Sequence, residues 1–174
     1  RRIRSREASR SSTGPCTLIK MRCETGVTIS LETYLTAALK ELDPEDAIPL
    51  QDTPYIDIDM EKTIFFNDTS AALNFNEARV FLNRLGIANY VRDRARPDIE
   101  FAGALISTKV SKPTRFALNA VNHAIGYLKN SKDLGITYTY GSLNMVGSSD
   151  ASHNPLPGSR QSADILVSIR GVAI

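Results

Sequence analysis

Residues 112–130, KPTRFALNAVNHAIGYLKN, contain a clear helical pattern. Small and apolar side chains recur there at intervals of three and four residues, which is the spacing of one face of an α-helix. The positions that we expect to point inward are Ala117, Ala120, Val121, Ala124 and Leu128. The spacing therefore predicts a helix that buries this face.

The segment before it, RPDIEFAGALIST (96–108), predicts another helix. Proline suits the first helical turn, where its missing N–H is not needed, and Pro97 falls there. Asp98 and Glu100 lie near the positive end of the helix dipole. The inward face is predicted to comprise Ile99, Ala102, Leu105 and Ile106.

Two more helices are predicted closer to the N-terminus. One runs from about Asn76 to Arg92, with a break or strain near Gly86. The other is SLETYLTAALKEL (30–42), with Ser30 as its N-cap. Its apolar positions are Leu31, Leu35, Ala38, Leu39 and Leu42. It should stop at Asp43, because the residue before a proline resists the helical conformation.

β-type runs lie at both ends of this helical region. TLIKMRCETGVTIS (17–30) predicts a hairpin, and further runs cover 135–140, 143–149 and 164–170. Ile165, Val167 and Ile169 alternate with polar or outward positions, as in a half-buried strand. Helices that come first and strands that follow predict an α+β fold.

Charge is distributed unevenly along the 174 residues, although the net charge is only +2. Residues 1–15 contain five arginines against one acid and predict a basic, disordered arm. Residues 43–68 hold eight acids and one lysine, and should form a loop. Cys16 and Cys23 lack the further ligands of a zinc site, and the sequence allows a disulfide between them without requiring one.

No apolar run is long enough to span a membrane, and no secretory signal is present, so an intracellular location, cytoplasmic or nuclear, is expected. The chain begins with Arg-Arg, which suggests a fragment of a longer protein.

Several short motifs together resemble copia-type LTR retrotransposon polyproteins, in the region where reverse transcriptase runs into RNase H. The matching segments, in order, are GVTISLETYLTAALKEL (26–42), Gly86 with Tyr90, RPDI (96–99), Ser107 with KPT (112–114), YLKNSKDLGITY (127–138), GSSDASH (147–153) and SRQSA (159–163). The sequence departs from the family at several positions: Gly126 stands where the family has Arg, and His153 where it has Trp.

The resemblance implies three parts. Residues 1–15 would be the basic arm, 16–133 the C-terminal or connection-like part of the reverse transcriptase, and 134–174 a truncated RNase H-like β-hairpin. RNase H cleaves the RNA strand of an RNA–DNA hybrid with two Mg²⁺ ions. By resemblance, Asp150 is the first catalytic and metal-binding acid of that site; a turn residue is the alternative.

One carboxylate supplies too few oxygens for two Mg²⁺ ions, so Asp150 could hold metal only with residues from outside this chain. Asp57 and Asp59 are a weak polymerase candidate, because Ile58 separates them and they lie downstream of the position of the family's paired acids. His123 is expected to pack beside Phe116 and Tyr127.

The remaining signal is basic. Arg92, Arg94, Arg96, Lys109, Lys112 and Arg115 fall around the ends of neighbouring predicted helices. Together they could form a positive patch that contacts hybrid phosphates, or a solvated surface without a partner. Arg96 could instead pair with Asp98 or Glu100.

The sequence thus predicts a piece of a polyprotein that contacts nucleic acid, an RNA–DNA hybrid in particular, without catalysing on its own, and with the rest of the polyprotein as a partner. The alternative is a decayed or domesticated retroelement copy that serves as a non-catalytic interaction module. An unrelated enzyme has no supporting set of residues.

Overall fold

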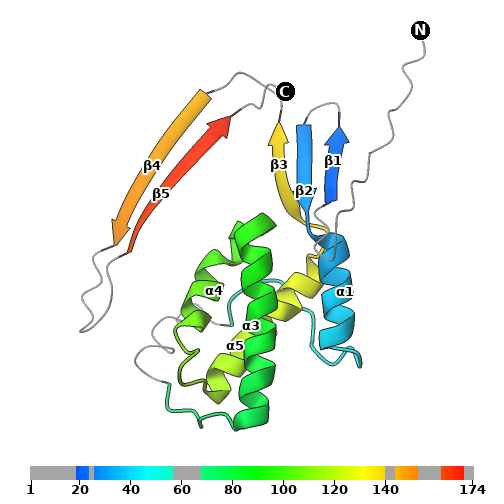
Figure 1. The fold of residues 1–174 in the computed structure, drawn as a ribbon, viewed down its shortest axis with the longest axis vertical. Coiled ribbons are helices and arrows are strands. Elements are labelled where there is room, and N and C mark those ends of the chain that lie inside the picture. The colour runs from blue at the N-terminus through cyan, green and yellow to red at the C-terminus, as the bar shows by residue number, and fades with distance from the viewer. Residues whose placement is uncertain (1–18, 24–25, 57–67, 140–143, 153–161, 171–174) are drawn as a thin grey trace.

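The computed structural model describes residues 19–23, 26–56, 68–139, 144–152 and 162–170. In chain order the elements are β1 (Ile19–Cys23), β2 (Gly26–Ser30), α1 (Glu32–Leu42), α3 (Phe75–Ala95), the 3₁₀ helix η2 (Pro97–Ile99), α4 (Glu100–Ser107), α5 (Arg115–Asn130), β3 (Gly135–Thr139), β4 (Asn144–Ser152) and β5 (Ser162–Arg170). The fold is α+β, as predicted. Figure 1 shows the helices below and the strands above.

Helix α5 is the centre of the helical part, because it contributes to two apolar clusters. The first lies among α3, α4 and α5 and contains Phe81, Leu85, Leu105, Ile106, Ala117, Leu118, Ala120, Val121 and Ala124. The second joins α1, α3, η2 and α5 and contains Leu31, Leu35, Leu39, Ile48, Ala88, Val91, Ala95, Ile99, Ile125 and Leu128. All five predicted inward positions of α5 are buried.

The predicted inward face of the segment 96–108 is also confirmed, since Ile99, Ala102, Leu105 and Ile106 are all buried. The segment is divided into η2 and α4, with Pro97 in the first turn as expected. In α1, Leu31, Leu35 and Leu39 are buried, and the helix ends at Asp43.

Two details of the predicted helices are wrong. Ser30 is the last residue of β2 and is buried, so Leu31 takes the N-cap position without a side-chain capping bond. Helix α3 runs without a break past Gly86, which is exposed. Buried side chains on both sides of it, Leu85 and Ala88, hold this helix to its neighbours. Their packing outweighs the cost of about 1 kcal/mol that a glycine imposes.

A capping box begins α3. The Asn74 side chain accepts from the Glu77 backbone N–H at 3.0 Å, and the Glu77 carboxylate accepts from the Asn74 backbone N–H at 3.1 Å. Two otherwise unpaired backbone donors are thereby bonded, which fixes where the helix starts. Of the acidic segment 43–68, residues 43–56 and 68 contain turns and bends but no helix or strand, as the loop prediction requires there, and residues 57–67 lie outside the described part of the chain. After the segment, Ala72 forms an isolated bridge with Thr114.

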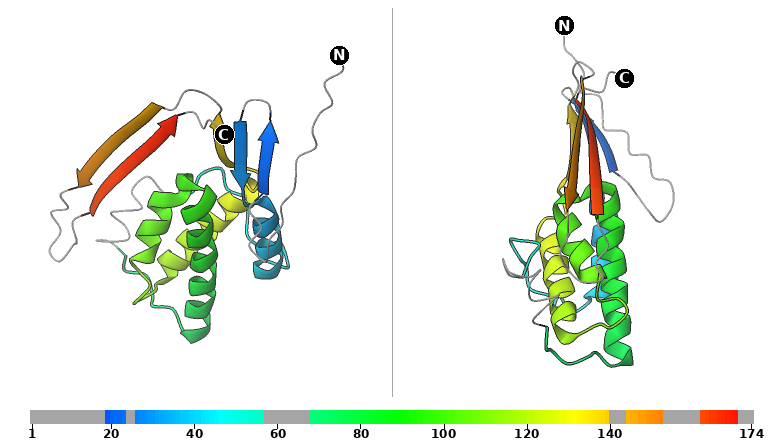
Figure 2. Two further views of the ribbon diagram at one scale, coloured as in Figure 1. Left: turned by 45° about the horizontal axis from the view of Figure 1, so that its top comes forward. Right: turned by 90° about the vertical axis from the view of Figure 1, so that its left-hand side faces the viewer.

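The strands form two separate sheets (Figures 1 and 2). Strands β1 and β2 form the predicted antiparallel hairpin, and β3 pairs antiparallel with β2, for example Ile29 opposite Ile136. Strands β4 and β5 pair only with each other among the described strands, over nine residues each.

The pairing of β3 with β2 joins a strand that follows residue 134 to a strand near the N-terminus. Strand β3 belongs to the sheet of β1 and β2. Alternation of side chains identifies a strand but not its partner, which is why the sequence did not show this pairing.

Candidate nucleic-acid interface

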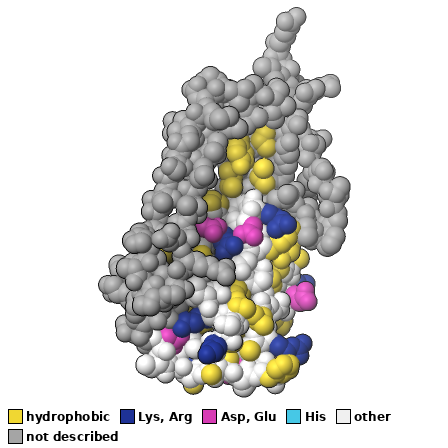
Figure 3. All heavy atoms as spheres, turned by 60° about the vertical axis from the view of Figure 1, so that its left-hand side comes forward, with side chains coloured by type: hydrophobic (Ala, Val, Ile, Leu, Met, Phe, Trp, Pro, Cys, Tyr) yellow, Lys and Arg dark blue, Asp and Glu magenta, His cyan; other side chains and the backbone are white. Residues whose placement is uncertain are grey.

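The six predicted nucleic-acid contacts fall into two groups. Arg92, Arg94 and Arg96 lie at the end of α3, whereas Lys109, Lys112 and Arg115 lie between α4 and the start of α5. In Figure 1 the end of α3 and the connection from α4 to α5 lie at opposite ends of the helical part. Figure 3 shows Lys and Arg side chains spread over the face in view, several beside Asp or Glu, and not gathered in one stripe. The single positive patch that the sequence suggested is therefore divided.

Arg96 is buried, with 1% of its surface exposed. Its Nε donates to the two carboxylate oxygens of Asp98 at 2.9 and 3.2 Å, and its Nη2 donates to Oδ2 at 2.7 Å. Nη1 donates to the carbonyl of Ser131, and Nη2 to its hydroxyl, both at 2.7 Å. The predicted pairing with Asp98 is confirmed, but it is a buried one. Arg96 is therefore not available to a phosphate.

The Tyr127 hydroxyl completes this network by donating to Oδ2 of Asp98 at 2.7 Å. Burial raises the pKa of Asp98, but the hydrogen bonds from Arg96 and Tyr127 outweigh burial and hold this pKa below its ordinary value. Burial and the bond to Asp98 raise the pKa of Tyr127. At neutral pH the carboxylate is therefore charged and the phenol is its donor, so the network joins α3, η2 and α5.

The other two arginines of this group differ in whether they form ion pairs. Nε of Arg92 lies 2.9 Å from Asp93 Oδ1 and 3.3 Å from Glu100 Oε2. Arg94 is exposed and makes no ion pair within the described residues. Its Cζ lies over the Tyr90 ring, 3.9 Å from the centroid. Arg94 is thus the cation of this group that remains free to meet an anion.

In the second group, Lys109 faces Asp68, whose side chain is only 1% exposed. The Lys109 Nζ lies 3.4 Å from Asp68 Oδ2. Asp68 also accepts from the backbone and hydroxyl of Ser70, at 3.1 and 2.5 Å, and from the Thr114 hydroxyl at 2.5 Å. Burial raises the pKa of Asp68, but these hydrogen bonds lower it below its ordinary value.

Thr114 is the N-cap of α5, and its hydroxyl accepts from the Ala117 backbone N–H at 3.3 Å. Asp68 therefore holds the start of α5 through Thr114. Arg115 pairs with Glu77 at 2.5 Å, from the start of α5 to the start of α3. Lys112 is exposed and has no ion pair among the described residues, so it is the free cation of this second group.

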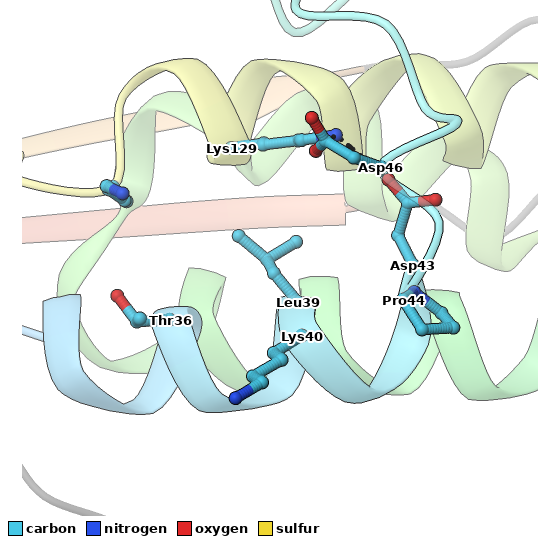
Figure 4. A pocket seen from close by; sticks show the side chains of 8 residues that line it. Thr36, Leu39, Lys40, Asp43, Pro44, Asp46 and Lys129 are labelled. Carbon is cyan, nitrogen blue, oxygen red and sulfur yellow. Dashed lines mark hydrogen bonds and ion pairs between the residues drawn. The ribbon is translucent and has the colours of Figure 1, made fainter.

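Lys129 forms a third charged cluster, which the sequence did not suggest. Its Nζ lies 2.9 Å from Asp43 Oδ2 and 2.5 Å from Asp46 Oδ1, and it donates to the Ile48 carbonyl at 2.8 Å. Hydrogen bonding to Asp46 raises the pKa of Lys129. Burial raises the pKa of Asp43, but the hydrogen bonds from Lys129 and from the backbone outweigh burial, so this pKa lies below its ordinary value. The cluster borders a depression of about 270 Å³ at the end of α1 (Figure 4).

Because both acids point at the lysine, we assign this cluster to holding the acidic loop against α5. The loop also crosses α5 at Gly126. The Gln51 backbone N–H donates to the Gly126 carbonyl at 3.3 Å, and a Cβ at Gly126 would collide with the Pro49 carbonyl oxygen. Gly126 is thus required by the close approach of this loop.

Asp150 lies in β4, and the register sets it directly opposite Asp164 in β5. These are the only acids in the two strands. Mg²⁺ takes about six oxygen ligands at about 2.0–2.1 Å, and two carboxylates do not supply a pair of such ions. The described residues contain no group of three metal-ligating side chains either. The residues of this hairpin therefore do not fit the paired ions by themselves.

The remaining sequence candidates contribute little to a site. Asp57, Asp59 and Cys16 lie outside the described residues. His123 is half-buried, and its Nε2 is 3.5 Å from the Thr53 hydroxyl, a contact the sequence did not predict. No described helix combines the length and the apolar character needed to cross a bilayer.

An aromatic contact between α1 and α3 was also missed. The rings of Tyr34 and Tyr90 lie with centroids 4.6 Å apart, inclined at 43°. The spacing of Tyr90 and Arg94, four residues apart on one helix, is the signal that could have indicated their contact. The meeting of Tyr34 with Tyr90 depends on how α1 packs on α3, which one segment alone does not show.

Comparison with protein-family models, with curated proteins and with solved structures gives no match for this chain.

Proposed function

We propose that this chain is a part of a copia-type retrotransposon polyprotein, from the end of the reverse transcriptase into RNase H. In this proposal it contacts nucleic acid, including RNA–DNA hybrid, and does not cleave it on its own. Residues up to β3 correspond to the reverse transcriptase part, and β4–β5 to the opening hairpin of RNase H.

One observation carries the proposal: residues from separate motifs of the resemblance meet in space. Arg96 and Asp98, from RPDI, bond to Tyr127 and Ser131, from YLKNSKDLGITY. Tyr34, from the segment 26–42, packs on Tyr90. The matched segments thus supply contacts that join the helices, and this arrangement supports the proposal.

The β4–β5 hairpin supports the second half of the proposal. Within the described residues, GSSDAS (147–152) lies in β4, and Ser162 and Ala163, the end of the SRQSA motif, lie in β5, which pairs with β4. With only Asp150 and Asp164 available on them, we expect no turnover without further acids.

Binding would be electrostatic and independent of base sequence. Arg94 and Lys112 are the exposed cations without ion pairs in the described part of the predicted contact set, and the sequence adds five arginines within residues 1–10. Contacts of this kind release counterions, so that affinity falls as salt rises.

A labelled RNA–DNA hybrid incubated with the chain and Mg²⁺ tests the catalytic half. The expected result is an intact RNA strand on a denaturing gel, under conditions where the hybrid is bound. Cleavage that persists in wild type and disappears in Asp150→Asn would overturn the proposal that the chain is non-catalytic.

A second function, a non-catalytic interaction module, is favoured by the outer face of α3. Phe75 is 78% exposed, Val80 43% and Leu82 46%, and several of the cations already have acidic partners. Absence of any salt-sensitive affinity for nucleic acid would favour this alternative.

A further inference from the structure

Three side chains form a ladder of contacts where the start of α1 meets the end of α3, with the Tyr34 ring tilted by 43° against the Tyr90 ring. Tyr34 packs on Tyr90 with ring centroids 4.6 Å apart, and the Arg94 guanidinium lies over Tyr90, 3.9 Å from its centroid. The two tyrosines are half-buried and Arg94 is exposed. The ladder therefore ends in a planar cation at the surface.

The charges around this ladder leave Arg94 as its one uncompensated cation among the described residues. Arg92, two residues earlier, is held between Asp93 and Glu100. Arg96, two residues later, is buried on Asp98. Arg94 therefore presents a planar, positively charged guanidinium whose position is supported by its contact with the Tyr90 ring.

A planar, weakly hydrated guanidinium stacks on π systems and also pairs with phosphate. Bases that are not paired in a duplex expose their faces, and proteins bind them by stacking on aromatic and guanidinium planes beside a positive charge. An interior base of a blunt hybrid is already stacked between its neighbours, so its face is not available for stacking on a side chain.

We propose that Arg94, supported by Tyr90 and Tyr34, is a stacking site for an unpaired nucleotide of a single-stranded nucleic acid. This inference rests on the proposed function, because it assigns one contact within the same nucleic-acid interaction. It adds a preference for single-stranded over duplex ligand, which the electrostatic proposal alone does not give.

A purely structural role is the competing account. Tyr90 and Arg94 are four residues apart on α3, and an exposed cation–π pair at this spacing stabilises a helix modestly. In that case the stack holds the helix end, and Arg94 meets nucleic acid only as one more positive charge. A lysine at this position separates the two accounts, since it keeps the charge and loses the plane.

The experiment measures fluorescence anisotropy of a labelled 12-nucleotide oligo(dT) and of a blunt RNA–DNA hybrid of the same length. Wild type, Arg94→Lys, Arg94→Ala and the control Arg79→Ala are compared at several salt concentrations. Arg79 is an exposed cation near the other end of α3. Thermal melts check that each variant is folded.

Arg94→Lys should weaken oligo(dT) binding about fivefold, the lower end of the effect of losing one stacked base, with an unchanged salt slope. Its affinity for the blunt hybrid should change less than about twofold. Arg94→Ala should weaken oligo(dT) binding more than Arg94→Lys does. It should also make the slope of log affinity against log salt shallower by about 0.7, the contribution of one phosphate contact on a single strand. Arg79→Ala should leave the preference between the two ligands as in wild type.

The stacking site is refuted if Arg94→Lys binds oligo(dT) as tightly as wild type does, or weakens both ligands equally. In either case salt-sensitive binding would survive, and the proposed function with it. Binding of neither ligand would refute the proposed function and the stacking site together.

Discussion

At the scale of single residues, the buried guanidinium of Arg96 determines much of the local order. A buried charge is tolerated only when its donors are bonded and its charge is paired, and Arg96 satisfies both conditions through Asp98 and Ser131. The Asp98 side chain keeps 36% exposure, so water shares in solvating the pair. Removing the arginine would take the charged donor from the Asp98 carboxylate, which would keep the bond from Tyr127, and would take one donor from the Ser131 carbonyl.

Arg96→Ala should therefore lower the free energy of unfolding by roughly 2–3 kcal/mol, somewhat less than a fully buried pair, because Asp98 is partly solvated. Tyr127→Phe removes one hydrogen bond to the same carboxylate and should cost about 1 kcal/mol. Lys112→Ala, at an exposed cation without a pair among the described residues, is the control and should change stability by less than about 0.5 kcal/mol. Urea denaturation measures all three, and equal stability of Arg96→Ala and Lys112→Ala would contradict the network.

Asp68 predicts a pH dependence. Its pKa in the folded chain lies below the ordinary value of 3.8, so the stability it adds is fully present above about pH 5 and is lost as the pH falls below 3.8 through the folded pKa. Asp68→Asn should destabilise the chain by roughly 1–3 kcal/mol at pH 7, since hydrogen bonds to a charged group are lost. The difference in stability between wild type and Asp68→Asn should become smaller as the pH is lowered toward 3. Melting temperatures measured from pH 7 to pH 3 check this, and a deficit independent of pH would count against a charged Asp68.

At the scale of elements, two glycines on different helices have opposite roles. A Cβ at Gly126 would meet the Pro49 carbonyl, because the acidic loop lies against α5, whereas a Cβ at Gly86 has no neighbouring atom within 4 Å. Replacing glycine by alanine should thus lower the free energy of unfolding at position 126 and raise it at position 86.

Gly126→Ala should destabilise the chain by about 1–3 kcal/mol through overpacking of this contact. Gly86→Ala should stabilise it by about 0.5–1 kcal/mol, because alanine is the better helix former at an exposed position. Thermal unfolding of the two variants beside wild type provides the measurement. If Gly126→Ala were as stable as Gly86→Ala, the loop would not lie where the structure places it.

The sequence predicted those elements whose signals are local. The inward faces of α4 and α5 follow from spacing alone, and the stop at Asp43 follows from the proline after it. Two errors and one omission share a cause. The continuity of α3 at Gly86, the burial of Ser30 and the pairing of β3 with β2 all depend on which other segment lies beside them.

The candidate site was predictable to a similar extent. The positions of the six cations could be read from the sequence, but the acids that neutralise four of them could not, except where Asp98 lies two residues from Arg96. Glu77 and Asp68 reach Arg115 and Lys109 from about 40 residues away in the chain, through the packing of α3 and the following loop. Exposure together with the lack of an ion pair among the described residues therefore singles out Arg94 and Lys112, since Arg115 is also exposed but pairs with Glu77.

At the scale of the whole molecule, the chain combines a helical part with its own three-stranded sheet and a separate two-stranded sheet. The first has buried clusters that connect every described helix. A two-stranded sheet alone is marginally stable in water, so β4–β5 needs a further surface to complete it. This requirement fits the proposal that the rest of a polyprotein is a partner.

The central claim is that the chain holds nucleic acid by charge. It is tested most directly by the salt dependence of its affinity for a labelled, blunt RNA–DNA hybrid between about 50 and 200 mM salt. Two exposed cations in contact with phosphates predict a slope of log affinity against log salt of about −1.8 or steeper, and Lys112→Ala should make it shallower by about 0.9. A slope near zero, or no measurable binding at 50 mM salt, would contradict the account.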